Sequence, residues 1–403
     1  MNGGNRLKRT VVLIALAVLV LTGCWDRREL NDIGIVVAVA LDKEPKTGKI
    51  IVTSQIIRPA ALAKGASQKE APVEIFSSTG NTTIEAARNV TQLLDRRNVY
   101  FHTKLLVISE QIAKEGVISY LDVFSRGRES RGYIWICVAK DSPSRDILGV
   151  KKGIEQIQAR HLVSLIRNEK FHYSSHTLNI LRFYKQILGT GINPVTGALE
   201  IVQSPAYPIE QKPEKKTRNI KLHQSAVFKK DKLVGYLTPQ EAQGYNWVIG
   251  KPKNGIMSMP SFLDPEKKYS VEILNSSSDI IPTLNGGKAS FVIRVKTTTA
   301  LAETQGQTKL LSPGQMLELI KKAERRNEEM IKTEIETAIR AAQNKFKSDI
   351  FGFGSSLSKK YPKEWDKMKS RWEELFPETE YTVEVKATIK RTELTHSPMK
   401  AEE

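Results

Sequence analysis

The sequence has 403 residues, enough for two or three domains, and its 62 Lys and Arg residues against 44 Asp and Glu residues give a formal net charge of +18. The basic residues are spread along the chain instead of forming one stripe with aromatic residues between them, which argues against a nucleic-acid-binding protein. Their diffuse positive field fits a protein beside anionic lipid or polyanionic wall material, or merely a soluble basic surface.

Residues 1–23 have the pattern of a bacterial lipoprotein signal peptide. Basic residues precede an unbroken apolar run, Val11 to Leu21. A helix of that length spans about 16 Å, roughly half of a bilayer core, so a secretory leader is favoured over a transmembrane helix. Gly23 and Cys24 end the sequence Leu-Thr-Gly-Cys, which looks like a lipobox. We therefore expect cleavage before Cys24, diacylglyceryl and N-acyl lipid on Cys24, and no transmembrane helix in the mature chain.

The residues after Cys24 suit a position close to a membrane. Arg27 and Arg28 carry charges that anionic headgroups attract. Trp25 has an amphipathic side chain of the kind favoured at a membrane interface, although packing into the first domain explains it equally well. Our hypothesis is that Trp25, Arg27 and Arg28 are membrane-proximal.

Residues 24–204 are predicted to form a mixed α/β domain, or two subdomains of that kind. Apolar β-branched runs indicate strands, and periodic apolar residues indicate helices, one of them opened by the capping box Thr82–Glu85. The strands are expected at Ile33–Leu41, Lys49–Arg58, Val73–Ser78, Phe101–Ser109, Tyr133–Lys140 and Leu199–Gln203, and further helices at Gln111–Phe124, Ile154–Lys170 and Thr177–Leu188. This order favours helices packed on a sheet.

Residues 205–222 are rich in Pro and charged residues and are predicted to form a linker to a second domain, 223–395, with a tail at 396–403. We expect the second domain to be α+β and largely antiparallel. Its expected elements are a hairpin of Ser225–Phe228 and Leu233–Leu237, a helix opened by the capping box Thr238–Glu241, strands Tyr269–Ile273 and Ala289–Thr297, a long helix from Ser312 to Ile350 with a bend near Asn327, a helix Pro362–Phe376 and a closing strand Tyr381–Ile389. Gly352 and Gly354 are expected to end the long helix.

The sequence predicts no catalytic, cofactor or metal site. His172 and His176 are four residues apart, but no third ligand is evident, and we expect a solvated pair in a turn. Cys137 lies in an apolar run and is expected to be a buried, inert thiol, so there is no disulfide framework. Trp365 and Trp372 share one helical face and are expected in the core, not in a ligand platform.

Several blocks, in order along the chain, resemble the Ger(x)C family of spore germination lipoproteins. These blocks are Cys24–Leu41, Phe101–Ser109 with Ala113–Gly116, Ser225–Leu237, Gly244–Gly250, Asp349–Gly354, Lys359–Trp365 and Trp372–Pro377. The resemblance covers nearly the whole mature chain and agrees with a mixed α/β, multidomain fold. The only functional residue that it carries over is Cys24.

The resemblance implies a non-enzymatic C subunit of a nutrient germinant receptor, anchored by its lipid to the outer face of the spore inner membrane. It implies partnership with integral-membrane A- and B-type subunits, no cofactor, no nucleic acid and no direct small-molecule ligand. The alternative is a lipid-anchored solute-binding protein that captures a nutrient itself. Such proteins usually place a flexible tether after the cysteine, whereas charged and strand-forming residues follow Cys24 at once. A wall-modifying hydrolase would need paired catalytic groups that the sequence does not offer.

Overall fold

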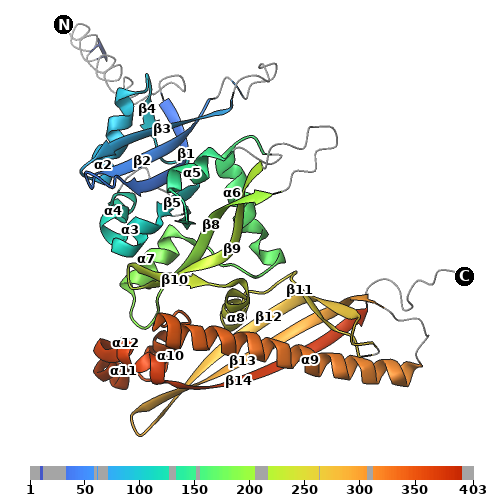
Figure 1. Ribbon diagram of the computed structural model, residues 1–403. Coiled ribbons are helices and arrows are strands. Elements are labelled where there is room, and N and C mark those ends of the chain that lie inside the picture. Colours follow the sequence, from blue (N-terminus) through green and yellow to red (C-terminus); the bar gives the residue numbers. More distant parts are fainter. Residues whose placement is uncertain are drawn as a thin grey trace, which may run out of the picture.

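The computed structural model describes residues 10–11, 33–58, 61, 71–126, 133–150, 155–204, 217–262, 264–305 and 312–392. These residues form two sheets with helices packed on them, one above the other in Figure 1. The fold is therefore the mixed α/β and α+β architecture that the sequence predicts.

The first sheet has ten strands. Eight of them follow one another in the order β10 (Lys232–Leu237), β9 (Thr217–Lys229), β8 (Val195–Ser204), β6 (Trp135–Lys140), β5 (Leu105–Ser109), β1 (Ile33–Lys43), β2 (Ile50–Ile57) and β3 (Val73–Gly80). The other two are short: β4 (Arg97–Val99) pairs with β1, and β7 (Leu178–Asn179) pairs with β6.

The centre of the first sheet is parallel and covered on both faces. β1, β5, β6 and β8 run parallel, and antiparallel strands flank them on either side. One face packs against α2 (Thr83–Asn89), α3 (Glu110–Glu115), α4 (Ile118–Arg126) and α7 (Ile180–Leu188), and the other against α5 (Ser144–Gly149) and α6 (Gln158–Arg167). Because both faces are buried, the central strands are almost continuously apolar, and Cys137 is fully buried in β6 as predicted.

The first sheet differs from the sequence prediction mainly at element ends. Residues 101–104 form a turn, so that β5 begins only at Leu105. The single helix predicted over 111–124 is two helices, because Gly116 adopts φ +123° between them. α5 and β4 were not predicted, since each is too short for a periodic pattern.

The predicted linker ends earlier than expected. Residues 205–216 lie outside the described residues, but 217–222 belong to β9 and pair with β8. The hairpin predicted over 225–237 forms as β9 and β10, and it extends the first sheet instead of opening the second. Buried apolar residues of β9, such as Ala226 and Phe228, pack into the core of the first sheet. Because residues 205–216 are rich in Pro, the neighbouring residues 217–222 were predicted as linker and not as strand.

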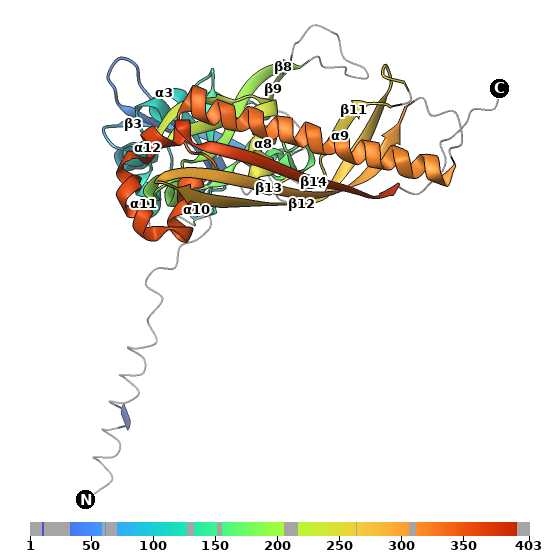
Figure 2. The same ribbon diagram turned by 90° about the horizontal axis from the view of Figure 1, so that it is seen from below.

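The second sheet has one helix-covered face and one polar face. Its order is β11 (Ile256–Pro260), β12 (Lys268–Asn285), β13 (Lys288–Thr304) and β14 (Glu380–Thr392), antiparallel except for the parallel pair β13–β14. α8 (Pro239–Val248) and α9 (Pro313–Arg340) pack on the apolar face (Figure 2). β12 and β13 are longer than predicted, and the turn at Gly286 and Gly287, both with positive φ, joins them.

α8 and α9 begin with the predicted capping boxes and pack closely. Thr238 and Glu241 cap α8 reciprocally, as Ser312 and Gln315 cap α9. A Cβ atom at Gly244 would lie 1.9 Å from the carbonyl oxygen of Glu334, so only glycine permits this helix–helix distance. α9 continues through Asn327 as one helix, and a π-helical turn follows at 341–346.

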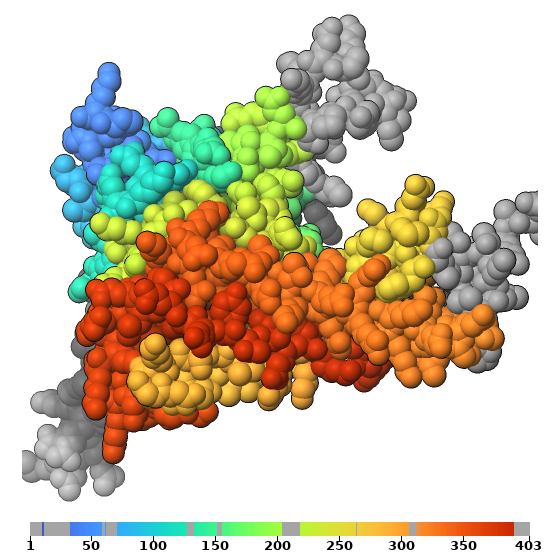
Figure 3. Space-filling model, turned by 60° about the horizontal axis from the view of Figure 1, so that its bottom comes forward, coloured from blue at the N-terminus to red at the C-terminus, as the bar shows by residue number. Residues whose placement is uncertain are grey.

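Two glutamates of α9 bond to the outer edge of β14. Glu328 accepts from the Ala387 backbone N–H at 3.1 Å, and Glu324 accepts from the Ile389 backbone N–H at 2.9 Å. β14 pairs with β13 on its other side, so these backbone groups would otherwise lack partners on the sheet. Figure 3 shows α9 and β14 side by side along this surface.

Asp349 organises the short helices after α9. Its carboxylate accepts from the backbone N–H groups of Gly352, Phe353 and Gly354 and from the Trp372 indole N–H, at 2.8–3.1 Å. Gly352 and Gly354 therefore lie at the start of a helix, α10 (Phe353–Lys360). The expectation that they end the long helix is wrong, since the π-helical turn that continues α9 ends at Lys347, with φ +46°. The helix predicted over 362–376 is interrupted, as α11 (Pro362–Met368) and α12 (Trp372–Leu375). Trp365 and Trp372 are buried, as predicted, and their rings pack edge to face.

A polar cavity as the candidate functional site

The residues predicted to act at the membrane, Cys24, Trp25, Arg27 and Arg28, lie outside the described residues. The nearest described element is β1, which starts at Ile33. Among the helices of the described ranges, none is both long and apolar enough to cross a membrane. The described chain offers a different candidate site, a cavity between the first sheet and the end of α8.

The cavity has a volume of about 610 Å³, within the range of small-molecule pockets in proteins. One wall comes from the first sheet and the segment between α6 and α7, and the other from the end of α8. Its lining consists of Tyr133, Trp135, Ile166, Arg167, Glu169, Lys170, Tyr173, Ser175, His176, Thr177, Asn179, Arg182, Asn246 and Lys251.

Asn246 holds the two walls together. Its side-chain amide donates to the carbonyl oxygens of Tyr173 at 2.8 Å and Ser175 at 2.9 Å. Tyr173 has φ +35°, a conformation that a bulky residue adopts only when its surroundings impose it. The same tyrosine packs edge to face against Trp247, with ring centroids 5.7 Å apart. The shape of the cavity wall is therefore fixed by buried contacts.

Glu169 is the anionic group of the cavity. One carboxylate oxygen accepts from the hydroxyls of Ser175 and Thr177, and the other accepts from the Thr177 backbone N–H at 3.1 Å. Burial raises the pKa of Glu169 to about 7, and those hydrogen bonds and the charge of Lys251 oppose the rise. A carboxylate offers about four lone-pair sites, so a further donor can still bind here.

The two histidines do not form a solvated pair, and that prediction is wrong for His176. Its side chain is 8% exposed and packs edge to face on Tyr245, while its backbone N–H donates to Ser225 at 2.8 Å. Burial, together with the charges of Lys251 and Arg182, lowers the pKa of His176 to about 3, so the ring is neutral at physiological pH. His172 is half-buried and lies 2.9 Å from the Ser174 hydroxyl. Within the described ranges, no three or more His, Cys, Asp or Glu residues are grouped as a metal site.

Four cations face the same cavity. Arg167, Lys170, Arg182 and Lys251 have exposed side chains and line it. Burial lowers the pKa of Lys251, and the neighbouring charge of Arg182 lowers it further while Glu169 opposes this. The cavity is therefore basic overall, with Glu169 as the single carboxylate among its lining residues.

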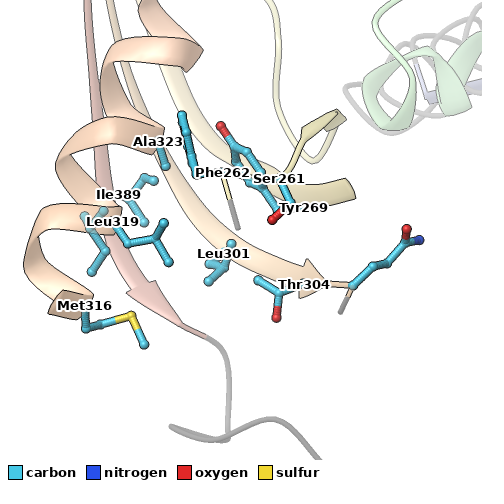
Figure 4. A pocket seen from close by; sticks show the side chains of 11 residues that line it. Ser261, Phe262, Tyr269, Leu301, Thr304, Met316, Leu319, Ala323 and Ile389 are labelled. Carbon is cyan, nitrogen blue, oxygen red and sulfur yellow. The ribbon is translucent and has the colours of Figure 1, made fainter. Parts of the chain in front are cut away.

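A second hollow, at the far end of the second sheet, is apolar (Figure 4). Leu319 and Ala323 of α9 face Leu301 of β13 and Tyr269 of β12 across it. Its volume of about 30 Å³ is close to that of one water molecule in the liquid, so it is too small for a ligand.

Comparison with known proteins identifies the family. A model described as the spore germination protein N-terminal domain matches residues 26–201, and one described as spore germination B3/GerAC like, C-terminal, matches residues 223–393. The chain belongs to the Ger(x)C family. Its two family regions together account for both sheets and nearly all of the described residues.

Relatives of this family match over almost their whole length. The chain is 28% identical to spore germination protein KC of Bacillus subtilis (strain 168), over 96% of this chain and 97% of that protein. It is 24% identical to spore germination protein B3 of the same strain, over 92% and 94% of the two chains. The crystal structure of the GerBC protein has the same fold, with a TM-score of 0.54 and 20% identity over 87% of this chain and 96% of the other.

Sequence reasoning did not find the cavity of this Ger(x)C protein. Glu169 falls in the helix predicted over 154–170, where a charged residue indicates only a solvent-exposed face. Lys251 follows a short helix about eighty residues later in the chain, so nothing in the sequence links the two. Only the docking of α8 against the segment that ends at Thr177 brings them together. The one available signal was Asn246, a polar residue within the apolar block Gly244–Gly250.

Proposed function

We propose that this chain is the lipid-anchored C-type subunit of a spore nutrient germinant receptor, and that it acts through assembly with integral-membrane A- and B-type subunits instead of catalysis. The observation that carries the proposal is that both family regions are present and that germination proteins match over 92–96% of the chain. A chain with only one of these regions would not support it.

The proposed anchor is Cys24. A diacylglyceryl group supplies two acyl chains, which anchor a protein stably, whereas a single chain binds only marginally. Arg27 and Arg28 would each add about 1 kcal/mol beside anionic headgroups, with Trp25 at the interfacial level. Ile33, where β1 begins, is nine positions after Cys24, and a fully extended segment of nine steps reaches about 30 Å. The first sheet would therefore stay close to the outer face of the spore inner membrane.

The anchor is tested with Cys24→Ala. We expect the variant to fold normally, to leave the membrane fraction of spores or remain uncleaved at Gly23, and to fail in nutrient-triggered germination. The matched control is Cys137→Ala, which removes the other cysteine and leaves the lipobox intact. If Cys24→Ala fractionates and germinates like the unaltered chain, the proposed anchor is wrong.

The partnership is tested by affinity purification of the tagged chain from detergent-solubilised spore membranes. Integral-membrane A- and B-type subunits should be recovered in stoichiometric amounts. A chain that is recovered alone, and that supports nutrient uptake without those subunits, would instead be a solute-binding lipoprotein.

A further inference from the structure

Two cations of the cavity, Arg182 and Lys251, form no close ion pair within the residues that the structure describes. No carboxylate oxygen lies within 4.0 Å of the Arg182 or Lys251 side chain anywhere in the described part of the chain, although such pairs occur elsewhere, as between Lys43 and Glu115 at 2.6 Å. Each of the two positive charges disfavours protonation of buried groups nearby, including His176. Within the described ranges, these two like charges therefore lie close together without a direct ion pair, and only the more distant charge of Glu169 acts on Lys251.

The cavity wall is already shaped to receive a ligand. Asn246 fixes the backbone of Tyr173 and Ser175, and Thr177 fixes the carboxylate of Glu169. Binding to a preformed site avoids the entropy cost of ordering a loop. Trp135, partly exposed, and Tyr133, 78% exposed, add aromatic surface to the same cavity.

We propose that this cavity binds a small organic anion, whose carboxylate or phosphate group is neutralised by Arg182 and Lys251 and whose hydrogen-bond donor faces Glu169. The charges select the class of ligand, because four cations and one carboxylate line the cavity. The remaining lone pair of Glu169 suits an ammonium or hydroxyl group on the same molecule. This site departs from the expectation of no direct small-molecule ligand, and it does not depend on the proposed assembly with membrane subunits.

Calorimetry on the processed, lipidated chain in detergent tests the proposal. The probes are inorganic phosphate, succinate and glutamate, which separate a phosphate, a dicarboxylate and a carboxylate that also carries an ammonium group. At least one probe should bind with a one-to-one stoichiometry, and binding should weaken as salt is added because the contacts are ionic. Tighter binding of glutamate than of succinate would indicate that Glu169 contacts the ammonium group of the ligand. Tighter binding of phosphate would indicate that the site recognises the anionic group alone.

Matched variants locate the site. Arg182→Gln and Lys251→Gln should each weaken binding about tenfold or more, since each removes a charge-assisted hydrogen bond. Lys185→Gln and Lys253→Gln remove the same charge from exposed positions on the same two segments that do not line the cavity, so they should change the affinity far less. Lys253 lies near enough for its charge to lower the pKa of Lys251, so Lys185→Gln is the cleaner of the two controls. All four side chains are exposed, so each variant should keep the melting temperature of the unaltered chain.

Two results would overturn the proposal. One is the absence of binding by all three probes at millimolar concentration. The other is binding that the two cavity substitutions and the two control substitutions weaken equally, because general electrostatic attraction would then account for it. Neither result bears on the anchoring of the chain or on its co-purification with membrane proteins.

Discussion

Glu334 is the buried carboxyl group of α9, and its replacement by glutamine should make the protein more stable at alkaline pH. Its side chain is 4% exposed, and the only hydrogen bond it receives from a side chain in the described ranges comes from the Trp247 indole N–H, at 2.7 Å. Burial raises the pKa of Glu334 from 4.5 to about 7, and this hydrogen bond only partly opposes the rise. Ionisation of Glu334 therefore lowers the unfolding free energy of the protein.

The size and sign of the effect follow from this difference in pKa. Between pH 4.5 and about 7 the folded chain binds more protons than the unfolded chain, so stability falls as the pH rises through that window. Each pKa unit corresponds to about 1.4 kcal/mol, which gives a cost of about 3 kcal/mol above pH 7. Glutamine keeps an oxygen for Trp247 but adds an amide N–H₂ that needs a partner, so we expect Glu334→Gln to gain about 1–3 kcal/mol near pH 8.

Urea unfolding followed by tryptophan fluorescence measures the effect. The gain should shrink to less than about 1 kcal/mol near pH 5, where the native carboxyl group is protonated in the folded state. Glu329→Gln is the matched control, because Glu329 is exposed on the same helix and its replacement should change stability by less than about 0.5 kcal/mol at either pH. A loss of stability near pH 8, or an equal gain at both pH values, would refute the reasoning.

Three further predictions concern the packing of two buried residues and the pairing of β8 with β9. Gly244→Ala should lower the unfolding free energy by more than about 3 kcal/mol, measured by the same unfolding assay, because its Cβ would overlap the Glu334 carbonyl oxygen; an unchanged midpoint would contradict this. His176→Ala should lower stability by about 2–4 kcal/mol and His172→Ala by less than about 1, so equal melting temperatures would show that the buried ring contributes nothing. Limited proteolysis should cut first within 205–216, and because β8 and β9 pair on either side, the two fragments should co-elute in gel filtration; separation without denaturant would disprove this.

The sequence predicted those elements well whose own residues form a recognisable pattern, such as a capping box, an alternation or an apolar run. The capping boxes at Thr238 and Ser312 placed the starts of α8 and α9, and alternation along 381–389 placed β14. The Val-rich run of β1 was equally clear, because a strand buried on both faces has to be apolar throughout.

Contacts between distant segments could not be predicted in the same way. Gly352 and Gly354 suggested the end of a helix, yet Asp349 uses their backbone N–H groups to begin one. His176 looked like a loop residue, since nothing local indicates that Tyr245 packs on it. The cavity also depends on contacts between distant segments, and no local sequence pattern indicates it. The candidate site is therefore visible only in the folded chain.

The hydrogen bonds from β14 to α9 limit how this protein can be joined by another chain. An open sheet edge invites an incoming strand, which gains its affinity from unsatisfied backbone groups. At Ala387 and Ile389 those groups already donate to the glutamates of α9, so strand addition there would have to displace two charge-assisted bonds. A partner chain should therefore not add a strand at this stretch of the β14 edge, and the protein should not polymerise through it.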